Sequence, residues 1–147
     1  MGATLNSKIA QIIGQMAEPL NAAVKRGSDW VMDDVEISML QGKHARWYKT
    51  GGKHVTGAGE HQASAPGEAP AIQTGNLLQS LKSEVTQSLD SFGGVAIGTF
   101  YSPLKLAVWM EFGTNRIAPR PYATIASERI WPDFVGECID AVVKAIR

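Results

Sequence analysis

The amino-acid sequence predicts an α+β fold within one domain, residues 1–147. Amphipathic helical patterns lie at both ends of the chain, and two strand-like segments flank a turn between them. The length suits a single hydrophobic core. We expect a long N-terminal helix, a flexible loop, a short helix, a small antiparallel hairpin, a second short helix and a C-terminal helix. The helices should pack on one face of the sheet.

The N-terminal helix is predicted by an apolar face that recurs at helical spacing. Pro19 and Gly27 interrupt this pattern, so a kink or a division into two consecutive helices is expected. Acidic residues cluster in its second half, and we interpret them as a solvated face because one helix cannot close a shell of carboxylates around a metal ion. The apolar face consists of Leu5, Ile9, Ile12, Ile13, Met16, Leu20, Val24, Val31, Val35 and Met39.

Residues 41–70 are rich in Gly, Ala, His and Lys and contain almost no aliphatic side chains. Such a segment buries too little apolar surface to offset its chain entropy, so we expect a long flexible loop. The loop is basic, and Trp47 and Tyr48 interrupt its basic residues. It could therefore track a nucleic-acid backbone or anchor an arm onto a neighbouring subunit. The basic residues that could face DNA are Lys43, Arg46, Lys49 and Lys53.

The segment 74–81 predicts a short helix that Thr74 or Asn76 could cap. Residues 83–89 and 95–100 predict a hairpin around a turn at 90–94. Two strands alone are marginally stable, so the hairpin must pack on helices or gain strands from neighbouring chains.

The stretch from Tyr101 to Tyr122 predicts a corner between two helices. Leu104, Val108 and Phe112 recur every four residues, and Gly113 is a typical helix stop. Pro119 and Pro121 hold Arg120 in a stiff, extended segment. The guanidinium of Arg120 could brace the corner by binding a carboxylate or helix-end carbonyls, or it could contact a partner. We expect Glu111 and Phe112 to form an exposed acidic and aromatic tip.

The last helical pattern begins near Tyr122, and Pro132 fits the first turn of a fresh helix. The apolar stripe that follows predicts core packing. Cys138, the single cysteine, lies on this stripe and is expected to be buried; it excludes an internal disulfide framework and fits a reducing cytosol. The stripe consists of Phe134, Val135, Cys138, Ile139, Val142, Val143 and Ile146.

Composition and motifs argue against several functions. Lys plus Arg and Asp plus Glu number fourteen each, so wholesale electrostatic binding to DNA or membranes is not expected. His44, His54 and His61 match no usual zinc spacing, and the motifs of common hydrolases and phosphate-binding loops are missing. We therefore expect no enzyme, metal or cofactor; a small histidine-dependent hydrolase is a remote alternative. No membrane span or signal peptide is expected.

Two motifs in the second half of the chain resemble the signature of neck, head–tail connector and tail-completion proteins of long-tailed bacteriophages. The upstream motif is Ala65-Pro66-Gly67-Glu68-Ala69-Pro70 followed by Thr74-Gly75-Asn76-Leu77-Leu78-Gln79-Ser80-Leu81. The downstream motif is Tyr101…Glu111-Phe112-Gly113-Thr114…Pro119-Arg120-Pro121-Tyr122…Ala126. Both stand in the order and at about the separation seen in that family.

The resemblance implies a structural virion protein, made in the bacterial host cytoplasm, that forms a homo-oligomeric ring of six or twelve subunits at the head–tail joint. The genome would pass through this ring, which would adjoin head-completion or connector and tail-tube proteins. The sequence does not give the subunit number or separate a neck ring from a tail terminator. A cyclic ring needs two different contacting patches. The candidate patches are the corner at Trp109, Glu111, Phe112 and Arg120, and the arm at Arg46, Trp47 and Tyr48.

An alternative of a different class is a nucleic-acid-binding module that uses the basic aromatic loop at residues 43–53. The two readings make different predictions. The module requires binding that weakens steeply with salt, whereas the ring requires self-association.

Overall fold

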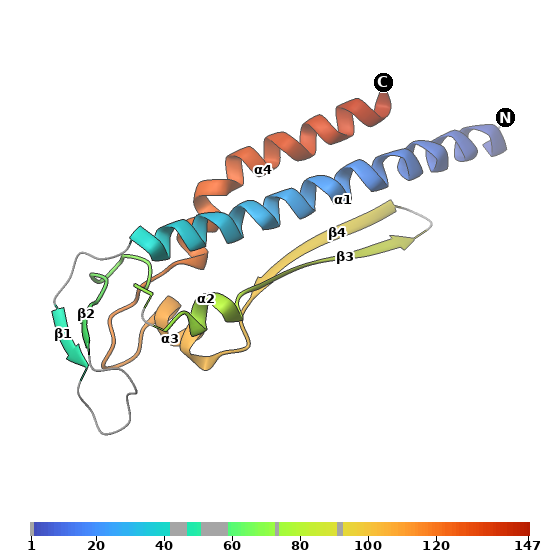
Figure 1. Cartoon of the computed structure of the whole chain (residues 1–147). Coiled ribbons are helices and arrows are strands. Elements are labelled where there is room, and N and C mark those ends of the chain that lie inside the picture. Colours follow the sequence, from blue (N-terminus) through green and yellow to red (C-terminus); the bar gives the residue numbers. More distant parts are fainter. Residues whose placement is uncertain (1, 42–46, 51–58, 73, 91–92) are drawn as a thin grey trace. The chain divides into compact units, whose positions relative to one another are not determined.

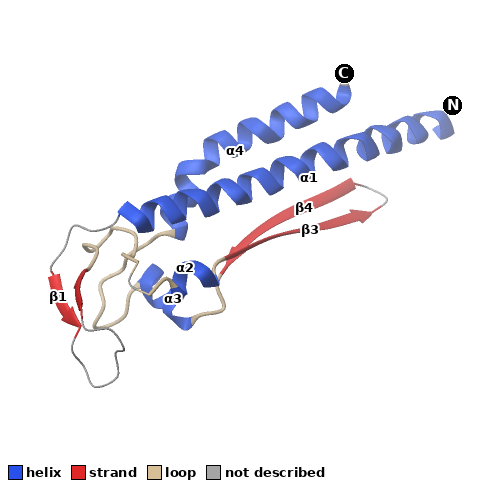
Figure 2. Cartoon of the chain, viewed as in Figure 1, coloured by secondary structure: helices blue, strands red, loops and turns tan. Residues whose placement is uncertain are grey.

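The computed structural model describes residues 2–41, 47–50, 59–72, 74–90 and 93–147 (Figures 1 and 2). It confirms an α+β fold with a long N-terminal helix, a two-stranded antiparallel hairpin, short helices and a C-terminal helix. The elements are α1 (Gly2–Gln41), β1 (Trp47–Thr50), β2 (Gly59–Gln62), α2 (Asn76–Ser80), β3 (Lys82–Asp90), β4 (Gly93–Tyr101), α3 (Lys105–Phe112) and α4 (Ala123–Ile146).

These elements form two compact units, each assembled from segments that are distant in the sequence. The first unit comprises residues 1–31, 83–100 and 128–147. The second unit comprises residues 32–82 and 101–127. Both α1 and α4 therefore contribute to each unit, and the signature segments of the sequence fall mainly in the second.

In the first unit, α1 packs against the β3–β4 hairpin and against α4. Gly98 of β4 approaches α1 closely, since a Cβ built on it would lie 3.2 Å from a methyl carbon of Val24. Gly27 of α1 allows a similarly close approach to α4, because a Cβ at this position would overlap the ring of Phe134. An ion pair between Arg26 and Glu137 also joins α1 to α4. Small residues at these positions therefore set how closely the elements pack.

The helix α1 is continuous from Gly2 to Gln41, with Pro19 inside it. The long N-terminal helix is therefore confirmed, and of the two alternatives for Pro19 and Gly27 the division into two helices is wrong. Gly27 interrupts the apolar pattern for a packing reason, because the ring of Phe134 occupies the space that a side chain would need. The apolar face is buried unevenly: Val35 and Met39 are fully buried, whereas Ile9 and Ile12 are exposed.

The C-terminal helix α4 begins at Ala123 and continues through Pro132, so the expected fresh start at Pro132 is wrong. The helix begins instead in the second unit, where the side chain of Glu111 on α3 caps its N-terminus. Core packing holds for only part of the apolar stripe, and its exposed members are Ile139, Val143 and Ile146.

The second unit contains a strand pair where the sequence predicted an unstructured loop. β1 and β2 pair antiparallel, with Trp47 opposite Gln62 and Thr50 opposite Gly59. The loop prediction is therefore wrong for these residues; its remaining parts at 42–46 and 51–58 lie outside the described residues. Backbone hydrogen bonding between strands does not require the aliphatic side chains whose scarcity suggested a loop.

Candidate assembly site at the α3–α4 corner

The corner is built on a tight turn at Ala65–Glu68. Gly67 has a φ of 84°, which suits the third position of a type II turn, and Pro66 occupies the preceding position. The Glu68 N–H donates to the Ala65 carbonyl at 3.1 Å, and the Glu68 carboxylate accepts from the Ala65 N–H at 2.8 Å. The Gly67 N–H then donates to the carbonyl of Pro119 at 3.0 Å. The two signature motifs are therefore in direct contact.

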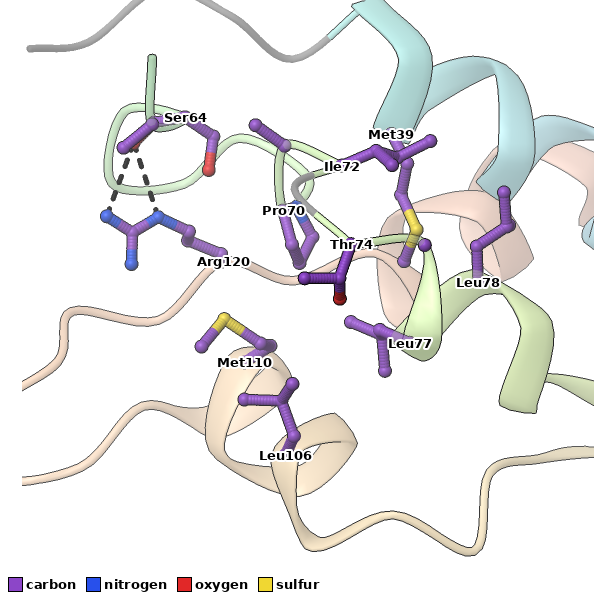
Figure 3. A pocket seen from close by; sticks show the side chains of 13 residues that line it. Met39, Ser64, Pro70, Ile72, Thr74, Leu77, Leu78, Leu106, Met110 and Arg120 are labelled. Atoms are coloured by element: carbon purple, nitrogen blue, oxygen red, sulfur yellow. Dashed lines mark hydrogen bonds between the residues drawn. The ribbon is translucent and has the colours of Figure 1, made fainter. Parts of the chain in front are cut away.

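Arg120 strengthens this contact. Its Nε and Nη2 atoms both donate to the Ser64 carbonyl oxygen at 3.3 Å, and its backbone N–H donates to the Met110 carbonyl at 2.7 Å (Figure 3). The residue joins the 64–68 turn to the C-terminal end of α3. Of the two roles considered for Arg120, the structure shows the brace, but the guanidinium binds a turn carbonyl and not the expected carboxylate or helix-end carbonyls. A partner contact remains a prediction.

Glu111 caps the N-terminus of α4 from a neighbouring helix. Its carboxylate accepts hydrogen bonds from the backbone N–H groups of Tyr122, Ala123 and Thr124 at 2.9, 3.0 and 2.9 Å. These donors have no partner within their own helix, and a negative charge is favourable beside the positive end of its dipole. Glu111 is only 9% exposed, so the expectation of an exposed acidic tip is wrong.

Titration behaviour follows from these contacts. Burial by itself raises the pKa of Glu111, but hydrogen bonds from the Thr124 side chain and from the three backbone N–H groups outweigh it and lower the pKa below its ordinary value. The carboxyl is therefore ionised in the native state at neutral pH. Burial and the negative charge of Glu111 raise the pKa of Tyr122 to about 12, so this buried phenol stays protonated.

Gly113 ends α3 as the sequence predicted. It has a φ of 75°, and its N–H donates to the Trp109 carbonyl at 3.0 Å. A Cβ at this position would lie 2.8 Å from the Ile117 carbonyl oxygen and 2.9 Å from the Pro119 nitrogen. A side chain here is therefore excluded both by backbone conformation and by space.

With Glu111 turned inward, α3 presents an apolar face to solvent. Ala107 and Glu111 are buried one turn apart, whereas Val108, Trp109 and Phe112 are exposed. Phe112 is 74% exposed at the tip of the helix. The periodic stripe that predicted this helix is thus only partly a core stripe, and an apolar face of this kind typically marks an interaction site.

A cavity of about 250 Å³ lies on another side of α3 (Figure 3). Its walls come from α1, α2, α3 and the segment that precedes α2, and they are largely apolar. Ser64 lines the cavity and is 1% exposed, and its hydroxyl finds no hydrogen-bond partner among the described residues. Arg120 also lines it. The main apolar contributors are Met39, Pro70, Ile72, Leu77, Leu106 and Met110.

The second predicted patch is described only in part. Trp47, Tyr48 and Lys49 lie on β1, where the structure gives their backbone pairing. Lys43, Arg46 and Lys53, with His44 and His54, lie outside the described residues. The structure thus brings together Trp109, Glu111, Phe112 and Arg120 at one corner and leaves the arm as a prediction.

Cys138 is a free, half-buried thiol in α4. Burial and the neighbouring charge of Glu137 raise its pKa, against a lowering by Arg26. A raised pKa disfavours the reactive thiolate.

Within the described ranges no group of three or more His, Cys, Asp or Glu side chains could hold a metal ion. None of the described helices is both long and apolar enough to cross a bilayer.

Two internal contacts of this corner could not be anticipated from sequence spacing. The acceptor of the Arg120 guanidinium lies 56 residues away, and the donors to Glu111 lie across a turn containing two prolines. Comparison with protein-family models, with curated proteins and with solved structures finds no match to this chain.

Proposed function

We propose that this protein is a structural component of a tailed-phage virion that assembles into a homo-oligomeric ring at the head–tail joint, where it completes the neck or terminates the tail. Its partners are further copies of itself and the adjoining head-completion, connector and tail-tube proteins. The genome passes through the ring and makes non-specific contacts with it.

The exposed apolar face of α3 is the observation that carries this proposal. Val108, Trp109 and Phe112 lie in solvent on a helix whose position is fixed by the Glu111 cap, the Arg120 brace and the Gly113 stop. A rigid element that presents large apolar side chains suits docking better than catalysis. The resemblance of the two motifs to phage neck and tail-completion proteins supports the same role.

Exposed apolar side chains are also present in the first unit. They lie on the outer face of the hairpin and along α4, and they are Val95, Ile97, Trp131, Ile139, Val143 and Ile146. A ring subunit has two neighbours as well as axial partners, and it needs more than one contact surface. Apolar groups on both units fit that requirement.

Negative-stain electron microscopy of the purified protein tests this proposal. The expected images show closed rings with a central opening wide enough for duplex DNA. Phe112→Ala, made at an exposed position, should reduce the rings while the thermal unfolding midpoint stays close to that of the parent protein. Dispersed subunits in the parent protein at every concentration would contradict the proposal.

A further inference from the structure

The cavity beside α3 is lined by a buried polar group without a hydrogen-bond partner within the described ranges. The hydroxyl of Ser64, one of the lining residues, is buried and finds no partner among the described residues. In Figure 3 this hydroxyl lies on the side of Ser64 that faces Pro70 and Arg120. A buried polar group without a partner is unfavourable. The site therefore calls for an apolar group that carries a hydrogen-bond acceptor next to it.

The size of the cavity is sufficient for an aromatic ring. Its volume is about 250 Å³ and most of its lining is aliphatic. An apolar cavity of about 150 Å³ is enough to hold benzene. A phenyl side chain therefore fits, with room for the atoms that connect it to a backbone.

The tip of α3 has the complementary features. Phe112 is 74% exposed. The carbonyls of Trp109 and Met110 accept bonds from Gly113 and Arg120, whereas no described residue donates to the carbonyl of Phe112. The C-terminal end of a helix also carries a partial negative charge. The guanidinium of Arg120, which lines the cavity, is the matching positive group.

One subunit cannot fill its own cavity with its own Phe112. Met110 lines the cavity. Phe112 follows it by two residues, so its side chain points about 200° around the helix axis from that of Met110. The ring and the cavity thus lie on different sides of one short helix. A second copy can supply the ring, and a net charge of zero does not oppose the approach of two copies.

We propose that Phe112 of one copy inserts into the Ser64–Arg120 cavity of the next copy. The Ser64 hydroxyl then donates to the Phe112 carbonyl, and the Arg120 guanidinium faces the negative end of the inserted α3. This contact is heterologous, so it propagates from copy to copy and closes into a ring when the rotation allows. The inference rests on the proposed assembly and specifies its interface.

Two complementary variants test this geometry by multi-angle light scattering. Phe112→Ala removes the inserted ring and keeps the cavity, whereas Ala71→Phe fills the cavity and keeps the ring. Each variant alone should be monomeric. Their equimolar mixture should form a dimer of twice 15.8 kDa, since one functional contact remains. Ile9→Ala, which truncates an exposed apolar side chain of α1 that belongs to neither contact, is the control and should assemble as the parent does.

The outcomes separate this inference from the assembly proposal. If both variants keep the parent's oligomeric mass, or their mixture stays monomeric, the insertion is wrong while self-assembly stands. If the parent protein is itself monomeric at every concentration, the assembly proposal fails and the insertion fails with it.

Ser64→Ala provides a second test that does not depend on the folding of the Ala71→Phe variant. It removes an unpartnered buried hydroxyl, so the thermal midpoint of the isolated subunit should rise or stay unchanged. The same change should weaken association roughly two- to tenfold, because one neutral hydrogen bond between copies is lost. Association that is unchanged in Ser64→Ala would overturn the hydroxyl–carbonyl contact.

Discussion

Glu111 is the residue on which the corner depends most. Three backbone N–H groups at the start of α4 donate to its carboxylate, and these groups would otherwise have no partner in a partly buried position. The same carboxylate fixes the rotation of α3, because two residues along a helix are rotated by about 200°, so that turning Glu111 inward turns Trp109 outward. A single internal cap thus sets which face of α3 is available to other molecules.

Replacing this carboxylate should destabilise the subunit. Glu111→Ala leaves three donors without an acceptor and should cost about 1–3 kcal/mol in the free energy of unfolding, measured by urea denaturation. Glu111→Gln keeps one acceptor oxygen and should cost about 1 kcal/mol. Glu128→Gln, at an exposed position of α4, is the matched control and should change stability little. Equal effects of Glu111→Gln and Glu128→Gln would contradict the cap.

The pH dependence of stability follows from the direction of the pKa shift. The pKa of Glu111 is lower in the folded state than its ordinary value of 4.5. The stabilisation from its charge is therefore complete above about pH 4.5 and is lost as the pH falls through the lowered pKa. Urea midpoints measured between about pH 6 and pH 3 should fall less steeply in Glu111→Gln than in the parent protein. Identical slopes would show that Glu111 is not held ionised by these contacts.

At the scale of the elements, the sequence was most informative where a pattern had a local cause. Gly113 ends α3 because of its own backbone conformation, and the periodic apolar residues of α1 and α4 form helices. It was least informative where the cause is a distant contact. The strand pair β1–β2 contains few of the aliphatic residues that would have predicted strands. Similarly, α4 starts at Ala123 because Glu111 caps it from another helix.

The candidate site, too, could be predicted from the sequence only in part. Exposure of Phe112 and the bracing option for Arg120 could be read from the corner motif. The cavity could not, because its lining comes from segments on both sides of the hairpin. Ser64, whose buried hydroxyl lines the cavity, carried no recognisable sequence signal.

Two glycines of α1 provide a test of element packing. Gly27→Ala should lower the free energy of unfolding by about 1–3 kcal/mol, because its methyl group would overlap the Phe134 ring on α4. Gly14→Ala, on the same helix with no neighbour within 4 Å, should raise it by about 0.5–1 kcal/mol through helix propensity. Thermal denaturation of both variants measures the difference. Stabilisation by both changes would contradict the close packing of α1 on α4.

At the scale of the whole molecule, each compact unit presents large apolar side chains to solvent. Such a chain is better suited to an assembly than to an isolated subunit. The net charge of the chain is zero, so its surface as a whole does not attract a nucleic acid. The basic segment at 43–53 is therefore the part best suited to contact one.

Contact with DNA should be weak and governed by salt. Fluorescence anisotropy with duplex DNA should detect binding at about 50 mM salt that is largely lost at about 200 mM. Changing Lys43, Arg46, Lys49 and Lys53 together to Gln should reduce the salt slope by about 0.9 for each phosphate contact removed. Lys144→Gln on α4 should leave the slope unchanged. Tight binding that persists at high salt in an unassembled subunit would instead favour a dedicated nucleic-acid-binding module.

Solution mass measured by multi-angle light scattering over a wide concentration range tests the central claim most directly. The ring proposal predicts one discrete species whose mass is a fixed multiple of 15.8 kDa, either at all concentrations or as the limit reached when concentration rises. Phe112→Ala should shift this species toward the monomer. A mass of 15.8 kDa at every concentration would contradict the account.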